Sequence, residues 1–222
     1  MRRWGVGEDE VFADRRAAGR RLAAALAHLR DAKPLVLALP RGGVPVGFEV
    51  ARALAAPLDV LLVRKIGAPD QPEFGLGAVV DGDPPQVVID ESLVGRVEPP
   101  PGYVQAETVR QIAELERRRA LYASARPGLD WEGRSAIVVD DGIATGGTVR
   151  AALRGLRPRM RALVLAVPVG PADTLWTLRS EADEIVCLST PDDFSAVGVF
   201  YADFAQTGDA EVMQLLREAQ PK

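Results

Sequence analysis

Two adjacent acids and a glycine-rich loop follow each other in the stretch AIVVDDGIATGGTVRAAL, residues 136–153. The apolar run 136–139 is typical of a buried strand. Asp140 and Asp141 come at its carboxyl end, where open α/β sheets form their ligand crevices. The next residues, ATGGT at 144–148, can present successive backbone N–H groups and two hydroxyls at the amino end of a helix. The spacing therefore predicts a phosphate site beside a pair of carboxylates.

Two familiar phosphate-binding loops do not fit this stretch. A Walker-type loop needs a lysine after Gly147, where Thr148 stands. A dinucleotide-binding fingerprint needs a glycine in place of Ala144 and an acid after the following strand, and neither is present. A ribose 5-phosphate fits better, because carboxylates accept hydrogen bonds from both ribose hydroxyls while the phosphate stays apart from them at the helix end.

The stretch AIVVDDGIATGGT resembles the binding signature for phosphoribosyl pyrophosphate in type I phosphoribosyltransferases. The resemblance implies that Asp140 and Asp141 hold the ribose hydroxyls. It also implies Mg²⁺ as cofactor, bridging pyrophosphate and ribose oxygens and bound by these two acids, in part through water. The 5-phosphate would be held by Ala144, Thr145, Gly146, Gly147 and Thr148.

The implied reaction is transfer of ribose 5-phosphate from phosphoribosyl pyrophosphate to a nitrogenous acceptor, such as a nucleobase in nucleotide metabolism, with release of pyrophosphate. A second glycine loop, LPRGGVP, resembles the family's pyrophosphate loop through Arg41, Gly42 and Gly43, although such a turn is also common as plain structure. Arg64 and Lys65 could neutralise pyrophosphate oxygens, and since side chains alternate along a strand, one of the two is expected to face the crevice. Catalysis would then rest on positioning and charge neutralisation by Asp140, Asp141, Arg41 and Lys65.

Strands alternate with helices along the chain, which predicts an α/β fold with a twisted, mostly parallel sheet and helices on both faces. We expect one domain over residues 1–222, with a hairpin around DGDPP and a helical insert at 91–130. The Gly- and Pro-containing residues 66–78 are expected to lack regular structure and match in position the family's mobile shielding loop. The N-terminal helix should bury one apolar stripe and face its arginines elsewhere, namely Arg15, Arg16, Arg20 and Arg21.

Residues 189–208 form a candidate acceptor-binding hood. This segment, the N-terminal helix and the insert helix resemble a subgroup of predicted phosphoribosyltransferases whose acceptor is not established. Phe194 or Tyr201 could stack on a flat base, with Val197 beside them, or these side chains could belong to the core. Dimers among relatives suggest a homodimer.

Composition narrows the class of protein. The net charge of −4 opposes nonspecific binding to nucleic acid, and no apolar run is long enough for a membrane span, so we expect a cytoplasmic protein with no nucleic-acid or membrane partner. Cys187 and His28 are single residues of their type, which argues against a disulfide or a zinc site. Two alternatives stay open: hydrolysis of a phosphorylated sugar, and a non-catalytic regulator that senses the ligand and binds nucleic acid through Arg150, Arg154 and Arg157.

Overall fold

The computed structural model describes residues 2–4, 11–126 and 128–220. Its main sheet has six strands in the order β1-β9-β8-β7-β2-β3, and every neighbouring pair is parallel. This arrangement confirms the predicted parallel sheet and adds an N-terminal edge strand that the sequence pattern did not indicate. The strands are β1 (Arg2–Trp4), β2 (Leu35–Ala38), β3 (Leu58–Val60), β7 (Ser135–Val139), β8 (Ala162–Val169) and β9 (Glu184–Ser189).

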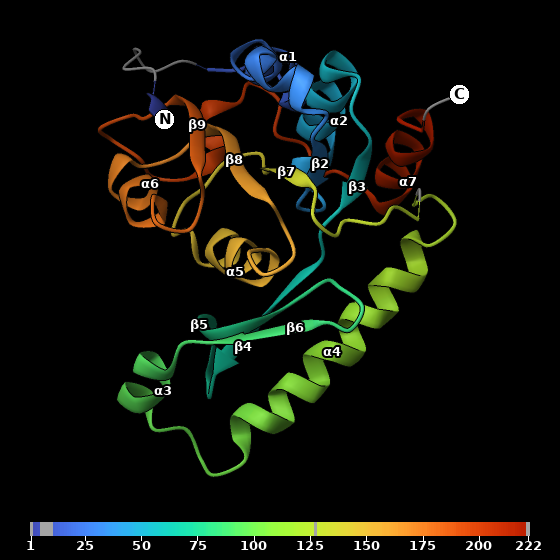
Figure 1. The fold of residues 1–222 in the computed structure, drawn as a ribbon. Helices are drawn as coiled ribbons and strands as arrows, with labels where there is room; N and C mark the ends of the chain where they lie inside the picture. The colour runs from blue at the N-terminus through green and yellow to red at the C-terminus, as the bar shows by residue number, and fades with distance from the viewer. Residues whose placement is uncertain (1, 5–10, 127, 221–222) are drawn as a thin grey trace.

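Helices cover both faces of the main sheet (Figure 1). One face carries α1 (Arg15–Ala25), α2 (Gly43–Leu54) and α7 (Asp209–Glu218), and the other carries α5 (Gly147–Leu156) and α6 (Ala172–Leu178). A short 3-10 helix, η1 (Ala27–Ala32), follows α1. Alternate side chains of each strand enter the two cores, as Val36 and Leu37 do in β2. Burial on both faces explains why the strands are continuous apolar runs.

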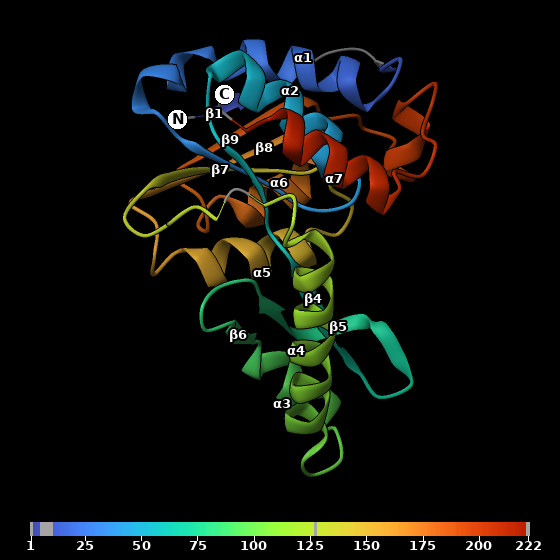
Figure 2. The ribbon, with the colours of Figure 1, turned by 90° about the vertical axis from the view of Figure 1, so that its right-hand side faces the viewer.

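A second, antiparallel sheet packs on the outer side of α5 (Figure 2). It consists of β4 (Val63–Ala68), β5 (Gln71–Val80) and β6 (Gln86–Ile89), and it precedes α3 (Glu91–Val97) and α4 (Tyr103–Tyr122). The β5–β6 pair is the hairpin predicted around DGDPP, and the two helices lie within the predicted insert. Gly155 of α5 allows the close approach of the two layers, because a Cβ there would lie 2.7 Å from Cβ of Val80.

Two predictions for residues 58–78 are wrong. The strand expected to carry Arg64 and Lys65 is not part of the main sheet, since β3 ends at Val60 and these residues belong to β4 in the other sheet. The segment 66–78, expected to lack regular structure, belongs to the β4–β5 hairpin with bulges near Gly67. The hairpin forms because it buries Ile66 and Leu76. The two strands can pair closely because Gly67 has no side chain: a Cβ there would lie 2.6 Å from the carbonyl oxygen of Pro72.

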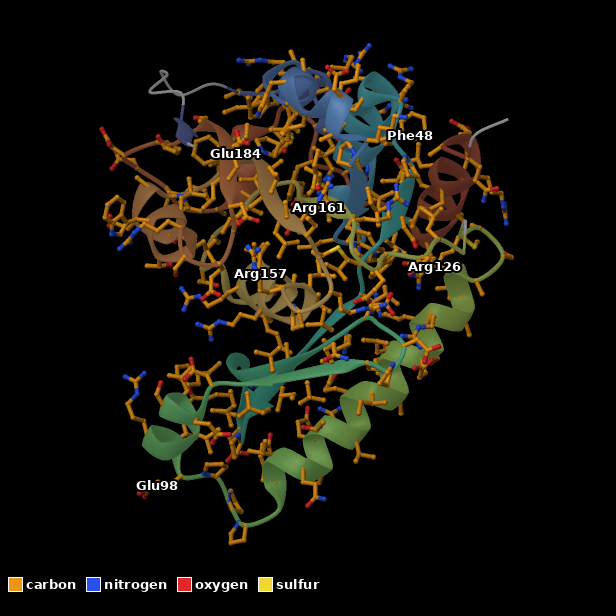
Figure 3. The ribbon with its side chains drawn as sticks, in the orientation of Figure 1. Phe48, Glu98, Arg126, Arg157, Arg161 and Glu184 are labelled. Atoms are coloured by element: carbon orange, nitrogen blue, oxygen red, sulfur yellow. The ribbon has the colours of Figure 1, made fainter. Side chains whose placement is uncertain are left out.

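An ion-pair cluster joins the second sheet and α4 to the main sheet. The guanidinium of Arg126 donates to Asp59 at 2.9 Å and to Asp81 at 3.0 Å, and Trp131 Nε1 donates to Asp59 at 3.2 Å. Figure 3 shows Arg126 where the end of α4 meets the main body. Burial raises the pKa of Asp59, although Arg126 opposes the rise. Because both acids are almost fully buried, this cluster fixes the place where the insert joins the sheet.

Candidate functional site

The candidate site lies where the order of the sheet reverses. The neighbouring strands β2 and β7 are followed by α2 on one face of the sheet and α5 on the other. In open α/β sheets, the ligand crevice forms at the carboxyl edge at such a reversal of strand order. The loops after these two strands are in direct contact, because the Leu39 amide donates to Val139 O at 2.9 Å. The fold thus brings together the two glycine loops that the sequence singled out.

Residues 144–148, the TGGT loop, form an open cup of main-chain amides. In the described part of the chain, none of the N–H groups of residues 144–149 donates to another protein group. Gly146 adopts a left-handed conformation with φ of 73° and is the N-cap of α5, and Thr174 Oγ1 fixes the loop by donating to Ala144 O at 2.9 Å. Ala144, Thr145 and Gly147 are exposed. The amides and the positive end of α5 therefore form a ready site for a phosphate.

Residues 41–43, the RGG loop, pack directly against the two acids. A Cβ on Gly42 would lie 2.0 Å from Asp141 Oδ2, and one on Gly43 would lie 2.7 Å from Val139 O. The Pro40–Arg41 peptide bond is cis. The amides of Arg41 and Gly42 have no acceptor among the described residues. This loop is thus a second amide cup, on the other side of the acid pair from the TGGT loop.

The acid pair is partly buried at the bottom of the crevice. Burial and the nearby charge of Asp141 raise the pKa of Asp140 well above its ordinary value. Burial also raises the pKa of Asp141, against the opposing hydrogen bond from Arg15. Asp140 Oδ1 accepts the Asp141 amide at 2.9 Å. Keeping these two neighbouring, buried carboxylates ionised therefore destabilises the folded protein. A ligand that donates hydrogen bonds to them or carries positive charge would reduce this destabilisation.

This electrostatic cost predicts a pH-dependent stabilisation by Asp140→Asn. The pKa of Asp140 is higher in the folded protein than in the unfolded chain. The free energy of unfolding therefore falls as pH rises from the ordinary pKa of an aspartate to the raised pKa of Asp140. We expect the variant to melt at a higher temperature than the parent near pH 7, and the difference to shrink toward pH 4. Thermal melts across this range measure it, and a difference independent of pH would contradict the assignment.

Arg15 is a site residue that the sequence reasoning missed. Its Nε donates to Asp141 Oδ2 at 2.8 Å, its Nη1 donates to Ala205 O at 2.7 Å, and its guanidinium lies 3.9 Å from the centre of the Phe204 ring. The side chain is only 11% exposed, so the prediction that it faces away from the buried part of the protein is wrong. Arg15 precedes the buried residues Ala18 and Leu22 by three and seven positions, so helical spacing places it on the buried stripe of α1. The same spacing that identified the stripe could therefore have found this arginine.

Arg41, Arg64 and Lys65 lie in three different surroundings. Arg41 is turned toward α7, with Nη1 3.9 Å from Asp209 Oδ2. Arg64 Nε donates to Gln111 of α4 at 3.1 Å, and burial lowers the pKa of this guanidinium. Lys65 lines a cavity together with Thr145 of the TGGT loop. The two neighbours do alternate in direction as expected, but they lie in the second sheet, not at the carboxyl edge of the main one.

The hood residues belong mainly to the packing of the site. Tyr201 is 5% exposed, between Phe12 and Phe204, and its hydroxyl donates to Asp141 O at 2.5 Å. Of the two alternatives for Tyr201, stacking on a base or packing in the core, the structure supports the core, and the hydroxyl holds the main chain of Asp141. Phe194 stacks on Phe200, and Val197 packs against Gly142 near the start of the 3-10 helix η2 (Val197–Phe200).

The arginines that suggested nucleic-acid binding are engaged with α6 and the turn after it. Arg150 donates to Thr177, and Arg154 and Arg157 form ion pairs with Glu181 and Asp183. This face of α5 thus packs on its neighbour and is not an open basic stripe.

Three further features concern single residues and composition. Cys187 is buried, and burial raises the pKa of its thiol to about 12. Over the described residues, no three His, Cys, Asp or Glu side chains gather into a metal-binding group, and no helix there has the length and apolarity that crossing a bilayer requires.

Comparison with known proteins identifies the family. A model of the phosphoribosyl transferase domain matches residues 10–205. The chain belongs to the phosphoribosyltransferase family. The crystal structure of TT1426 from Thermus thermophilus has 44% sequence identity and a TM-score of 0.83, and the match covers 95% of this phosphoribosyltransferase-family chain and 100% of that one.

Curated relatives agree with this membership. Protein Rv0571c of Mycobacterium tuberculosis H37Rv, described by name as a phosphoribosyl transferase, is 46% identical over 211 residues, which is 95% of this chain and 47% of the relative. Adenine phosphoribosyltransferase of Corynebacterium efficiens is 33% identical over 124 residues, 54% of this chain and 61% of that enzyme. The chain therefore spans about half the length of the Mycobacterium protein.

Proposed function

We propose that this chain transfers ribose 5-phosphate from phosphoribosyl pyrophosphate to a nitrogenous acceptor and releases pyrophosphate. The observation that carries the proposal is the presence of two cups of unbonded main-chain amides, in the TGGT and RGG loops, on either side of one acid pair. A single ribose carrying an anion at each end would match this order of groups. The family membership of residues 10–205 supports the same interpretation.

Each part of the crevice has a role in this reaction. The TGGT loop and the amino end of α5 bind the 5-phosphate, and Asp140 and Asp141 accept hydrogen bonds from the ribose hydroxyls. The RGG loop receives the pyrophosphate, whose negative charge grows as its bond to C1 breaks. The acceptor nitrogen then forms the new bond to C1. Because the loops are held by close packing, they stabilise this charge with little rearrangement.

The residues present also fit a Mg²⁺ ion. Mg²⁺ is commonly bound through one or two carboxylates together with substrate phosphates and water. The crevice offers two carboxylates, of which Asp141 is already bound to Arg15 and Asp140 accepts only the amide of Asp141 among the described residues. Asp140 and Asp141 would hold the ion together with substrate oxygens. When bound, it supplies neutralisation of charge on the leaving pyrophosphate.

A panel of acceptors tests the proposal. Labelled phosphoribosyl pyrophosphate is incubated with the chain, Mg²⁺ and purines, pyrimidines or other amines in turn, and labelled product and pyrophosphate are measured, with chelator as control. We expect pyrophosphate release that needs both Mg²⁺ and one class of acceptor. Release without any acceptor would show hydrolysis instead. Binding without turnover across the panel, together with salt-dependent binding to DNA or RNA, would favour a sensing regulator.

Arg15 is expected to act as a positioning residue for Asp141. In Arg15→Gln the carboxylate loses a charge-assisted hydrogen bond, so its pKa should rise further and its orientation should relax. We expect KM for phosphoribosyl pyrophosphate to rise about tenfold, with a smaller change in kcat. The acidic limb of the pH profile of kcat/KM should move to higher pH.

Two further variants separate this role from a general loss of stability. Arg15→Lys keeps the positive charge and should restore most of the pH profile. Arg20→Gln removes an exposed arginine of the same helix, 3.8 Å from Glu49, and should leave both KM and the pH profile unchanged. An unchanged pH profile in Arg15→Gln would refute the positioning role.

A further inference from the structure

A cavity of about 380 Å³ lies between α5 and the second sheet. Its walls come from β4, β5 and β6, from the start of α3 and from α5. Asp140, Asp141 and the RGG loop do not line it, so it lies outside the crevice of the acid pair. It shares Thr145 and Gly147 with the TGGT loop. The proposed reaction uses these two residues and gives no role to the rest of the cavity.

The cavity combines an apolar wall with positive charge. Phe74, Val88 and Leu93 supply apolar side chains, and the Phe74 ring is 44% exposed in spite of its size. Three basic residues line the same space, namely Lys65, Arg150 and Arg154.

The acid among the wall residues is occupied by local hydrogen bonds. Asp90 caps α3 by accepting from the amides of Ser92 and Leu93 at 3.1 and 3.2 Å, and it also accepts the Ser92 hydroxyl. These hydrogen bonds lower the pKa of Asp90, and the bond from the Ser92 hydroxyl has the largest effect. Asp90 keeps its negative charge, and Arg154 is already ion-paired with Glu181 at 2.8 Å. The positive charge that an anion in the cavity would meet therefore comes from Arg150 and from the positive end of α5.

One donor on this wall is unsatisfied. The Nε atom of Arg150 is buried and has no hydrogen-bond partner among the described residues, although Nη2 of the same guanidinium donates to Thr177 at 2.8 Å. A buried donor without an acceptor is costly, above all on a charged group. A small rotation of the side chain toward the cavity would let an anion bound there accept from this group.

We propose that the cavity is a binding site for a small aromatic anion, distinct from the ribose site. The flat apolar part lies against Phe74 and Leu93, and the phosphate, sulfonate or carboxylate group lies near Arg150, whose Nε has no partner among the described residues. The volume falls within the range of about 300–1,000 Å³ that is typical of small-molecule pockets. Electrostatic attraction fixes the orientation of the ligand, and burial of its ring provides affinity.

Occupation of the cavity should affect the TGGT loop, because Thr145 and Gly147 belong to both. This coupling rests on the proposed function, whereas binding to the cavity does not. A ligand that changes the position of these two residues would change the affinity for phosphoribosyl pyrophosphate, and by linkage the reverse would hold. The cavity is thus suited to an effector.

Fluorescence titration with 8-anilinonaphthalene-1-sulfonate, an aromatic anion, tests the site on the full chain. We expect saturable binding, weakened at least tenfold by Arg150→Gln, which removes the guanidinium with the unsatisfied donor, and by Leu93→Glu, which puts an acid on the apolar side of the cavity. Two matched controls change residues outside the wall: Arg157→Gln, just beyond the end of the same helix (Figure 3), and Val87→Glu, next to Val88 on β6. Both controls should alter the Kd less than twofold.

Circular dichroism confirms that each variant is folded, and either of the two test variants suffices to decide. Unchanged Kd in the folded test variants, or equal losses in the controls, would overturn the proposal. These titrations contain no phosphoribosyl pyrophosphate and no acceptor. Failure of the proposed function would therefore leave the result intact, and loss of the site would leave the transferase assay intact.

Discussion

Asp140→Asn combined with Asp141→Asn is expected to lower kcat/KM by about 10³-fold or more while the protein stays folded. Asparagine preserves the shape of both side chains but removes the two charges that would hold the ribose hydroxyls and the metal ion. The protein should still fold, because the substitutions remove two negative charges that burial and mutual repulsion make unfavourable in the folded state. Steady-state kinetics on the acceptor found in the panel, with a thermal melt of each protein, measures both effects.

The matched control is Asp173→Asn, which removes an exposed acid from the first turn of α6. It should leave kcat/KM unchanged. Activity of the double variant within tenfold of the parent would show that the acid pair is not part of the reacting site. Loss of folding cooperativity in the double variant, with the control unaffected, would show that the pair is mainly structural.

Gly42→Ala is expected to lower kcat/KM by about 10²-fold. The backbone of Gly42 is ordinary αR, with φ of −60°, so an alanine causes no strain of its own. The added methyl group would nevertheless lie 2.0 Å from Oδ2 and 2.7 Å from Cγ of Asp141, and the acid or the RGG loop must move. Either movement misplaces a group that holds the substrate, and crowding of this kind costs about 1–3 kcal/mol of stability.

Gly95→Ala is the control for this substitution. A Cβ at Gly95, within α3, meets no atom within 4 Å, and alanine is a better helix former than glycine. Its kcat/KM should equal that of the parent and its stability should be equal or higher. Equal activity of Gly42→Ala and Gly95→Ala would contradict the close contact between the RGG loop and the acid pair.

The sequence was sufficient for the parts of the site that follow from local pattern. Continuous apolar runs identified strands buried on both faces, and the residues after them were placed correctly at one edge of the sheet, as with Asp140 and the TGGT loop. The RGG loop was singled out through its resemblance to the family's pyrophosphate loop, and it does lie at the same edge of the sheet. These predictions succeeded because a parallel strand, its loop and the next helix form a unit whose direction follows from its own residues.

The failures concern contacts between distant segments. Nothing near Arg15 in the chain indicates that Asp141, 126 residues away, will accept its hydrogen bond. For Tyr201 the sequence could not decide between stacking on a base and packing in the core, because its neighbour Phe12 comes from a distant segment that only the fold brings next to the hood. Residues 66–78 were assigned to a loop because glycine and proline mark turns, whereas here Gly67 permits close pairing of two strands.

For the proposed transfer reaction, the hydrogen bond from the Tyr201 hydroxyl to the main chain of Asp141 constrains any attempt to change the acceptor. Grafting the hood of a relative onto this scaffold would replace the residue that holds the acid in place, together with whatever selects the incoming base. Chimaeras that retain Tyr201 should keep donor binding while their selectivity changes. Those that lose it should bind the sugar phosphate poorly whichever base is offered, and engineering of specificity here must begin from the residues around that tyrosine.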